Sequence, residues 1–233
     1  MIEKTLKTTE GKLRVKIPGS LYEVTLGQMM EIQGKPALND FEAISILSGL
    51  PVDQLQNVCD INDLQLFGDV IQTLAHQIKH LYNSDTIPKK ITFSLGESCK
   101  TINVIGNLSV EPAGAFMAAR DIIADEINGH IKQYGPDNWE EHFNPSLKAC
   151  CQVLAHYFYC RATGKKYNEY EAEEFCNEIK KLRVTEALPI AKHFFTCYPA
   201  LSKRKTNYFH QCRQFLRKKL AYNPSKNLNI STL

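Results

Sequence analysis

Two stretches of the chain, residues 21–30 and residues 108–117, are similar to each other and lie 87 residues apart. Each stretch follows a segment with a strand pattern and opens a segment rich in helix signals. The sequence therefore predicts two related units, followed by a basic tail. The matched pairs are Ile17 and Val104, Gly19 and Gly106, Leu21 and Leu108, Gly27 and Gly114, and Met30 and Met117.

The predicted fold class is α+β and predominantly α-helical, with each unit built from a small β-hairpin followed by a helical bundle. A chain of 233 residues is long enough for one large domain or two small ones. An apolar content of 43% is ordinary for a globular protein and sufficient for a core. The predicted parts are unit 1 over residues 1–87, unit 2 over residues 88–197, and a C-terminal basic helix with a polar tail over residues 198–233.

Both hairpins are predicted from apolar residues that alternate with polar ones, the pattern of a strand with one buried face. Residues 12–17 show this alternation, and we expect them to pair with residues 4–8. In the second unit, residues 89–95 and 100–105 flank residues 96–99. We expect a second hairpin there, with a four-residue loop.

Capping residues and apolar stripes with a period near 3.6 predict the helices. Residues 147–160 are apolar nearly all round, so we expect this helix to be the most buried element. Residues 169–182 are predicted as one helix with acidic residues early and lysines late. Helices are also expected after Thr25, after Asn39 or Asp40, over residues 52–58, from Asn62 or Asp63 to about Tyr82, after Pro112, from Thr185, and over residues 206–222.

Several classes of protein are disfavoured by composition. The longest apolar runs are too short to cross a membrane. The first twelve residues lack the apolar segment of a secretory signal, so we expect no export. The cysteines form no CxxC pair, and we expect reduced thiols, mostly on apolar helix faces, as in a cytoplasmic protein. The eight cysteines are at positions 59, 99, 150, 151, 160, 176, 197 and 212.

Histidine and cysteine neighbours give weak candidates for a metal or catalytic site. His76 and His80 have the i, i+4 spacing that can chelate a metal, but the metalloprotease pattern HExxH is absent. We interpret them as solvated histidines on the polar face of their helix. His156 lies near Cys150, Cys151 and Cys160 in the sequence, and we interpret this group as apolar packing. We expect no metal site and no cofactor.

Other catalytic patterns are also weak. The chain has no GxGxxG or GxxxxGK[ST] phosphate loop. Glu171, Glu173, Glu174 and Glu178 lie on one predicted helix, and we interpret them as a solvated face. A Cys/His enzyme would need a concave pocket that holds a perturbed Cys or His, and this alternative stays open. We expect no catalytic residues.

The basic tail is the feature that points most directly to a function. Residues 198–233 contain eight Lys or Arg and no Asp or Glu, which leaves 20 basic and 25 acidic residues in the rest of the chain. Such a tail could bind an acidic protein surface, including that of a neighbouring subunit, or nucleic acid, or it could be a solvated helix without a partner. The candidate partner-binding residues are Lys203, Arg204, Lys205, Arg213, Arg217, Lys218 and Lys219.

Two motifs of the first unit resemble the tail-assembly proteins of tailed bacteriophages, particularly phages of Bacteroides-type hosts. They are VTLGQMMEIQ (24–33) and DFEAISILSGLPVDQLQNV (40–58). In that family a hairpin leads into a helix that opens with TLG(Q/E), and a second, degenerate copy begins with NL(S/T). Here IGNLSVEPAGAFMAARDII (105–123) is in that place. The resemblance covers about residues 10–197.

The resemblance implies a non-enzymatic structural or assembly protein that contributes to a tail or head–tail connector through protein contacts. Its expected partners are other phage structural proteins and further copies of itself, as a homo-oligomer or ring, with no membrane. Its expected location is the virion, assembled in the host cytoplasm. Two alternatives remain: a transient tail-assembly chaperone absent from the mature virion, and a nucleic-acid-binding protein that acts through the basic tail.

Overall fold

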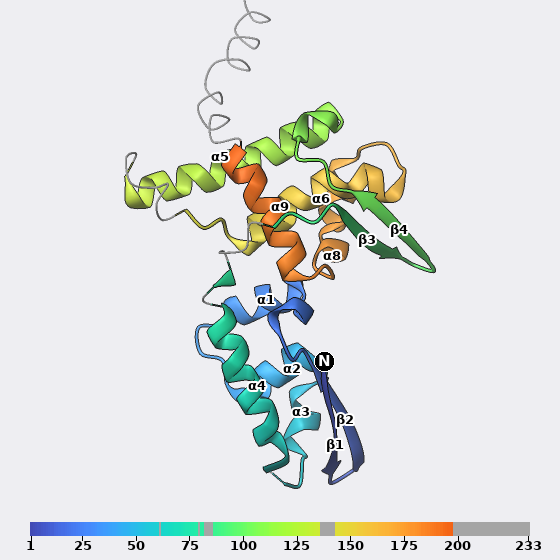
Figure 1. Ribbon diagram of the computed structural model, residues 1–233, viewed down its shortest axis with the longest axis vertical. Helices are drawn as coiled ribbons and strands as arrows, with labels where there is room; N and C mark the ends of the chain where they lie inside the picture. The colour runs from blue at the N-terminus through green and yellow to red at the C-terminus, as the bar shows by residue number, and fades with distance from the viewer. Residues whose placement is uncertain (61, 79, 82–85, 136–142, 198–233) are drawn as a thin grey trace, which may run out of the picture.

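The computed structural model has an α+β fold that is mostly helical, with two small antiparallel hairpins (Figure 1). The predicted helix over residues 206–222 and all seven candidate basic residues of the tail lie outside the described part of the chain. The structure describes residues 1–60, 62–78, 80–81, 86–135 and 143–197.

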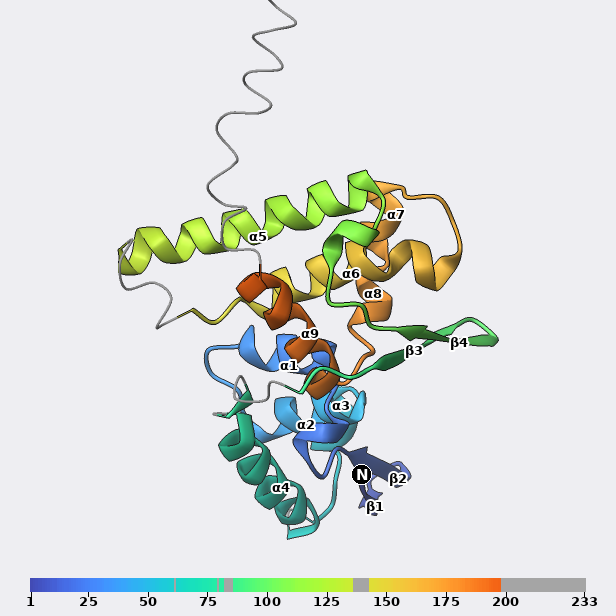
Figure 2. The same ribbon diagram turned by 45° about the horizontal axis from the view of Figure 1, so that its top comes forward.

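The hairpins form two separate two-stranded sheets, as the alternating pattern predicts. The first pairs β1 (Ile2–Thr8) with β2 (Gly11–Ile17), and the second pairs β3 (Lys90–Leu95) with β4 (Ser98–Asn103). One face of each hairpin packs on the core, and the strands extend outward from the helices in both views (Figures 1 and 2).

The loop of the second hairpin corrects the sequence prediction. Leu95 pairs with Ser98, so the loop has two residues rather than the four predicted over 96–99. Gly96 has a φ of 62°, the left-handed conformation that a tight two-residue turn requires and that glycine adopts without steric cost. The prediction failed because Ser98 and Cys99 are both exposed in β4. These two residues therefore do not show the alternation of buried apolar and exposed polar side chains from which the strands were predicted.

Between the two hairpins the described residues form four α-helices. They are α1 (Leu26–Gln33), α2 (Asp40–Ser48), α3 (Val52–Gln56) and α4 (Asn62–Ile78). The predicted caps of the first two are confirmed, because Thr25 forms a capping box with Gln28 and Asn39 forms one with Glu42.

The helix α6 (Leu147–Thr163) is buried along most of its length, as predicted. This helix contacts α1 and four other helices of the described residues. They are α5 (Ala113–Tyr134), α7 (Glu169–Glu174), α8 (Cys176–Ile179) and α9 (Val184–Cys197). Figures 1 and 2 show α5 across one end of the molecule, α6 and α9 in the middle, and α4 at the opposite end.

The single helix predicted over residues 169–182 is wrong, because the chain forms α7 and α8 with Phe175 between them. Phe175 is buried, with its ring 5.4 Å from that of Phe93. Beyond α8, the carbonyls of Lys180 and Leu182 accept hydrogen bonds from the first amides of α1. This long-range pairing satisfies the otherwise unbonded N–H groups at the start of that helix.

Several elements in and after the two hairpins begin 87 residues apart. β2, the short 3₁₀ helix η1 (Leu21–Glu23) and α1 begin at residues 11, 21 and 26. β4, the 3₁₀ helix η3 (Leu108–Val110) and α5 begin at residues 98, 108 and 113, in each case 87 residues later. The helices then differ, because α1 has 8 residues and α5 has 22. Across the described residues, no helix is both long and apolar enough to span a bilayer.

Candidate functional site

A hollow of about 380 Å³ lies between α2 and α4. Its floor is apolar and is formed by Phe41, Ile44 and Leu64. Its rim is acidic and amide-bearing, with the exposed side chains of Asp40, Asn62, Gln65, Asp69 and Gln72. We call this hollow the α2–α4 groove.

The helical period places the rim residues. Gln65, Asp69 and Gln72 are spaced four and three residues apart on α4, so they project from the same face of that helix. Asp40 is the first residue of α2, where a carboxylate is favoured by the positive end of the helix dipole. Within the described residues, neither Asp40 nor Asp69 forms an ion pair through its side chain. The groove therefore offers two carboxylates beside an apolar floor.

Gly68 lies in the wall of the groove, in the interior of α4. A Cβ atom added to it would meet no other atom within 4 Å. A glycine in a helix interior costs about 1 kcal/mol relative to alanine, and no neighbour in the described structure requires one here. The effect of this glycine is to keep the groove open.

Two further hollows lie elsewhere on the first unit. One of about 580 Å³ lies between the end of α1 and α2, and is lined by Lys35, Leu50 and their neighbours. Another of about 210 Å³ lies beside the tip of the first hairpin, where Thr8 and Asn57 line it. Among the described residues, none of these three hollows is lined by a cysteine or a histidine.

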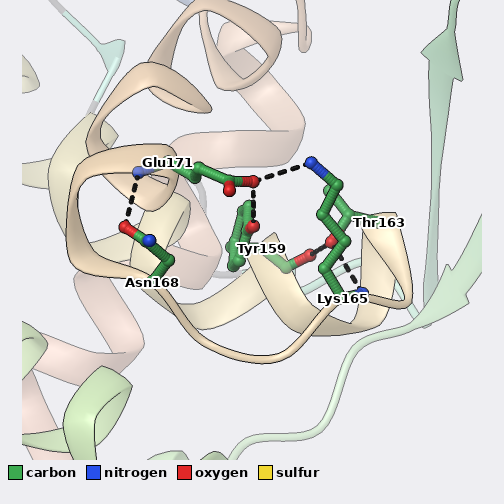
Figure 3. Close-up of polar contacts among 5 residues, drawn as sticks. All are labelled: Tyr159, Thr163, Lys165, Asn168 and Glu171. Atoms are coloured by element: carbon green, nitrogen blue, oxygen red, sulfur yellow. Dashed lines mark hydrogen bonds and ion pairs between the residues drawn. The ribbon is translucent and has the colours of Figure 1, made fainter.

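A polar network closes the loop between α6 and α7 (Figure 3). The carboxylate of Glu171 accepts hydrogen bonds from the Tyr159 hydroxyl at 2.5 Å and from Lys165 Nζ at 2.7 Å. Asn168 caps α7 by accepting from the Glu171 amide, and Thr163 donates to the Tyr159 carbonyl. Lys165 and then Tyr159 hold the pKa of Glu171 below its usual value. Glu171 therefore belongs to this network and is not only part of a solvated face.

A second polar cluster joins α6 to the segment before α5. Arg161 pairs with the buried carboxylate of Glu111, and its guanidinium lies 4.3 Å from the centre of the Tyr157 ring. The Arg161 Nη1 donates to the Asn103 carbonyl, and the Tyr157 hydroxyl bonds the backbone of Ile105. These contacts attach the end of β4 to α6.

Cys150, Cys151 and His156 of α6 are buried in the core, and Cys160 is partly buried. Burial raises the pKa of the Cys150 thiol, and contact with Cys176 followed by burial raises that of Cys151. His156 is bonded through Nδ1 to the Tyr167 hydroxyl at 3.0 Å, and burial lowers its pKa. Across the described residues, no three His, Cys, Asp or Glu side chains are grouped so that they could hold a metal ion.

The other sequence candidates are on the surface. His76 and His80 are exposed, with ring centres 5.8 Å apart. Cys59, Cys99 and Cys197 are exposed as well. The α2–α4 groove was missed at the sequence level because it depends on how two helices pack. Its two signals in the sequence are a glycine inside the apolar pattern of α4 and a long segment without basic residues.

Comparison of the chain with protein-family models, with curated proteins and with solved structures finds no match. The proposals below therefore rest on the residues and geometry of this chain. Of the features described, the α2–α4 groove is the one whose shape and charge are suited to a partner.

Proposed function

We propose that the protein is a non-enzymatic structural or assembly protein of a tailed bacteriophage, and that it contributes to a tail or head–tail connector through protein contacts. The single observation that carries this proposal is the α2–α4 groove, with an apolar floor beneath an acidic rim. The two phage-like sequence motifs cover α1 to α3 and therefore include one wall of the groove.

The chemistry of the groove supports a peptide partner. An apolar floor between two helices can receive the apolar side chains of a third helix, while charges at the rim select its orientation and its partner. The lining side chains are carboxylates, carboxamides and hydrocarbons, which suit recognition through burial and hydrogen bonds. Specificity would come from the two carboxylates, which favour a basic partner.

We also propose that the chain arose by duplication of a hairpin-plus-helices module over residues 1–87 and 88–197. The equal offsets of β2, η1 and α1 from β4, η3 and α5 support this proposal. Val24 and Glu111, which are equivalent under the 87-residue shift, are both buried. Duplicated modules would give the protein two related surfaces for assembly.

The test is mass spectrometry of salt-washed virus particles from the phage whose genome encodes this chain. A resident structural protein is expected in the particles at a fixed ratio to the other tail proteins. Its absence from purified particles, together with its presence in assembly intermediates, would instead identify a transient chaperone. A gene that lies outside any phage genome would contradict the proposal altogether.

The basic tail supports a second candidate, a nucleic-acid-binding protein. Eight positive charges without an acidic residue would bind phosphates with an affinity that falls steeply as the salt concentration rises. Fluorescence anisotropy with labelled DNA and RNA, measured at two salt concentrations, tests it. Binding that does not depend on salt, or no binding, eliminates this candidate.

A further inference from the structure

We propose that the α2–α4 groove binds the basic segment 203–222 of a second copy of this chain, so that copies associate head to tail. The inference rests on the proposed function, because it names the partner of the same groove. Three observations carry it: the charges of the two segments, the match between groove floor and tail, and the place where α9 ends.

The segment that forms the groove carries only acidic side chains among its charged residues, and the tail carries only basic ones. Residues 36–78, which include both walls of the groove, contain six acidic residues and no Lys or Arg. Residues 198–233 contain eight Lys or Arg and no acidic residue. Such segregation steers one surface toward the other and disfavours basic partners for the groove and acidic partners for the tail.

The apolar pattern of the tail fits the groove floor. In residues 206–222 the apolar side chains recur at intervals of three and four residues, the spacing that places them on one face of a helix. Arg213 and Arg217 each follow an apolar position of this stripe by one residue. If this segment is helical, its apolar face can enter the groove between Phe41 and Leu64, while its arginines face Asp40 and Asp69.

The position of α9 favours a second copy over the same copy. α9 begins beside α1, where Val184 bonds Val24, and its far end lies toward α5 in both views (Figures 1 and 2). The groove lies at the other end of the molecule, between α2 and α4. The end of α9 and the groove are therefore separate places on one copy, so contact between copies would be heterologous and would close into a ring or extend as a filament.

Gly68 supplies a test that leaves the fold of the free protein intact. Gly68 lines the groove, and a Cβ atom added there would have nothing within 4 Å, so we expect Gly68→Phe to place its ring in the groove while the chain still folds. Gly129 is the matched control, because it lies inside α5, far from the groove, and its added Cβ would also meet nothing within 4 Å. Asp69→Lys is a second groove variant, which replaces a carboxylate at the rim with a longer, positively charged side chain.

The experiment measures the native mass of the full-length protein by light scattering over a range of concentrations. We expect the unmodified protein and Gly129→Phe to associate equally. Gly68→Phe, Asp69→Lys and the tail variant Arg213→Glu/Arg217→Glu should each weaken association by about tenfold or more, because each removes part of the same interface. Circular dichroism and thermal unfolding of each variant verify that it is folded.

Mixing a groove variant with a tail variant tests whether the tail of one copy binds in the groove of another. A mixture of Gly68→Phe, which keeps its tail, and Arg213→Glu/Arg217→Glu, which keeps its groove, should form a two-chain complex and nothing larger. A monomeric unmodified protein, no complex in the mixture, or equal weakening by Gly129→Phe would overturn the inference. A tail that binds DNA with the groove blocked, and does not join copies, would also overturn it. A monomer that is nevertheless found in virus particles would leave the proposed function standing.

Discussion

The Nε of Arg161 lies 2.8 Å from Oε1 of Glu111, whose side chain is 2% exposed. Burial raises the pKa of Glu111, and the neighbouring Arg161 charge opposes that rise. Val24, which lies 87 residues before Glu111 in the sequence, is also buried. Val24 is buried without a charged partner, whereas the buried carboxylate of Glu111 is paired with Arg161.

Removing Arg161 alone should destabilise the protein more than removing both members of this pair. Arg161→Leu leaves a buried carboxylate without its charge partner, which costs about 3 kcal/mol or more. Glu111→Val should cost less, because Arg161 is 23% exposed and keeps its bond to the Asn103 carbonyl. The double variant should be more stable than Arg161→Leu alone. Urea unfolding of the three variants measures these differences, and strictly additive losses would contradict the pairing.

The stability of the protein should fall as the medium becomes mildly acidic, because of His156. Burial lowers its pKa below the ordinary 6.5, while Glu169 and Glu173 oppose that shift. The unfolded chain therefore takes up a proton first, so the stabilisation is complete above pH 6.5 and is lost as the pH falls toward the folded-state pKa. Protonation would also remove the lone pair with which Nδ1 can accept from Tyr167.

Thermal unfolding between pH 5 and pH 8 measures this effect. His156→Gln should flatten the pH dependence, although it lowers the melting temperature at pH 8. His76→Gln is the matched control, because His76 is exposed on α4 and lies outside the core around α6. Equal flattening in both variants would show that His156 is not the responsible group.

The parts of the fold that could be predicted from the sequence are those set by local chemistry. The capping boxes of Thr25 and Asn39 follow from side chains three residues apart, and the burial of α6 follows from its apolar surface. The break at Phe175 could not be predicted, because it accompanies contacts with Phe93 and the bonding of Lys180 to α1, which are distant in sequence.

The candidate site was less predictable for the same reason. A groove exists only once α2 and α4 are packed at a particular distance, and no local pattern sets that distance. Asp40 and Asp69 are ordinary surface acids in the sequence. The predicted basic tail residues, such as Arg213, lie outside the described residues, so their role stays a prediction.

Gly27 and Gly114, which lie 87 residues apart, should be required for close packing. A Cβ on Gly114 would lie 2.7 Å from two ring carbons of Tyr167, and one on Gly27 would lie 3.2 Å from the Lys180 carbonyl oxygen. We expect Gly114→Ala to lower the free energy of unfolding by about 1–3 kcal/mol through overpacking. Gly129→Ala, in open space on α5, should raise it by about 0.5–1 kcal/mol. Urea unfolding compares them, and stabilisation by Gly114→Ala would show that Tyr167 moves freely.

The rate at which each cysteine reacts with a thiol reagent should depend on how deeply its side chain is buried. Cys59, Cys99 and Cys197 are exposed. In a Cys212→Ser variant at pH 8, these three thiols should react with a disulfide reagent in the fastest kinetic phase. Cys150 and Cys151 are buried and have raised pKa values, so they should react only after unfolding in denaturant. Their protection then reports the opening of the core around α6, since a thiolate must form before attack. Reaction of either buried thiol at the rate of Cys59 would place α6 near the surface and contradict the packing described here.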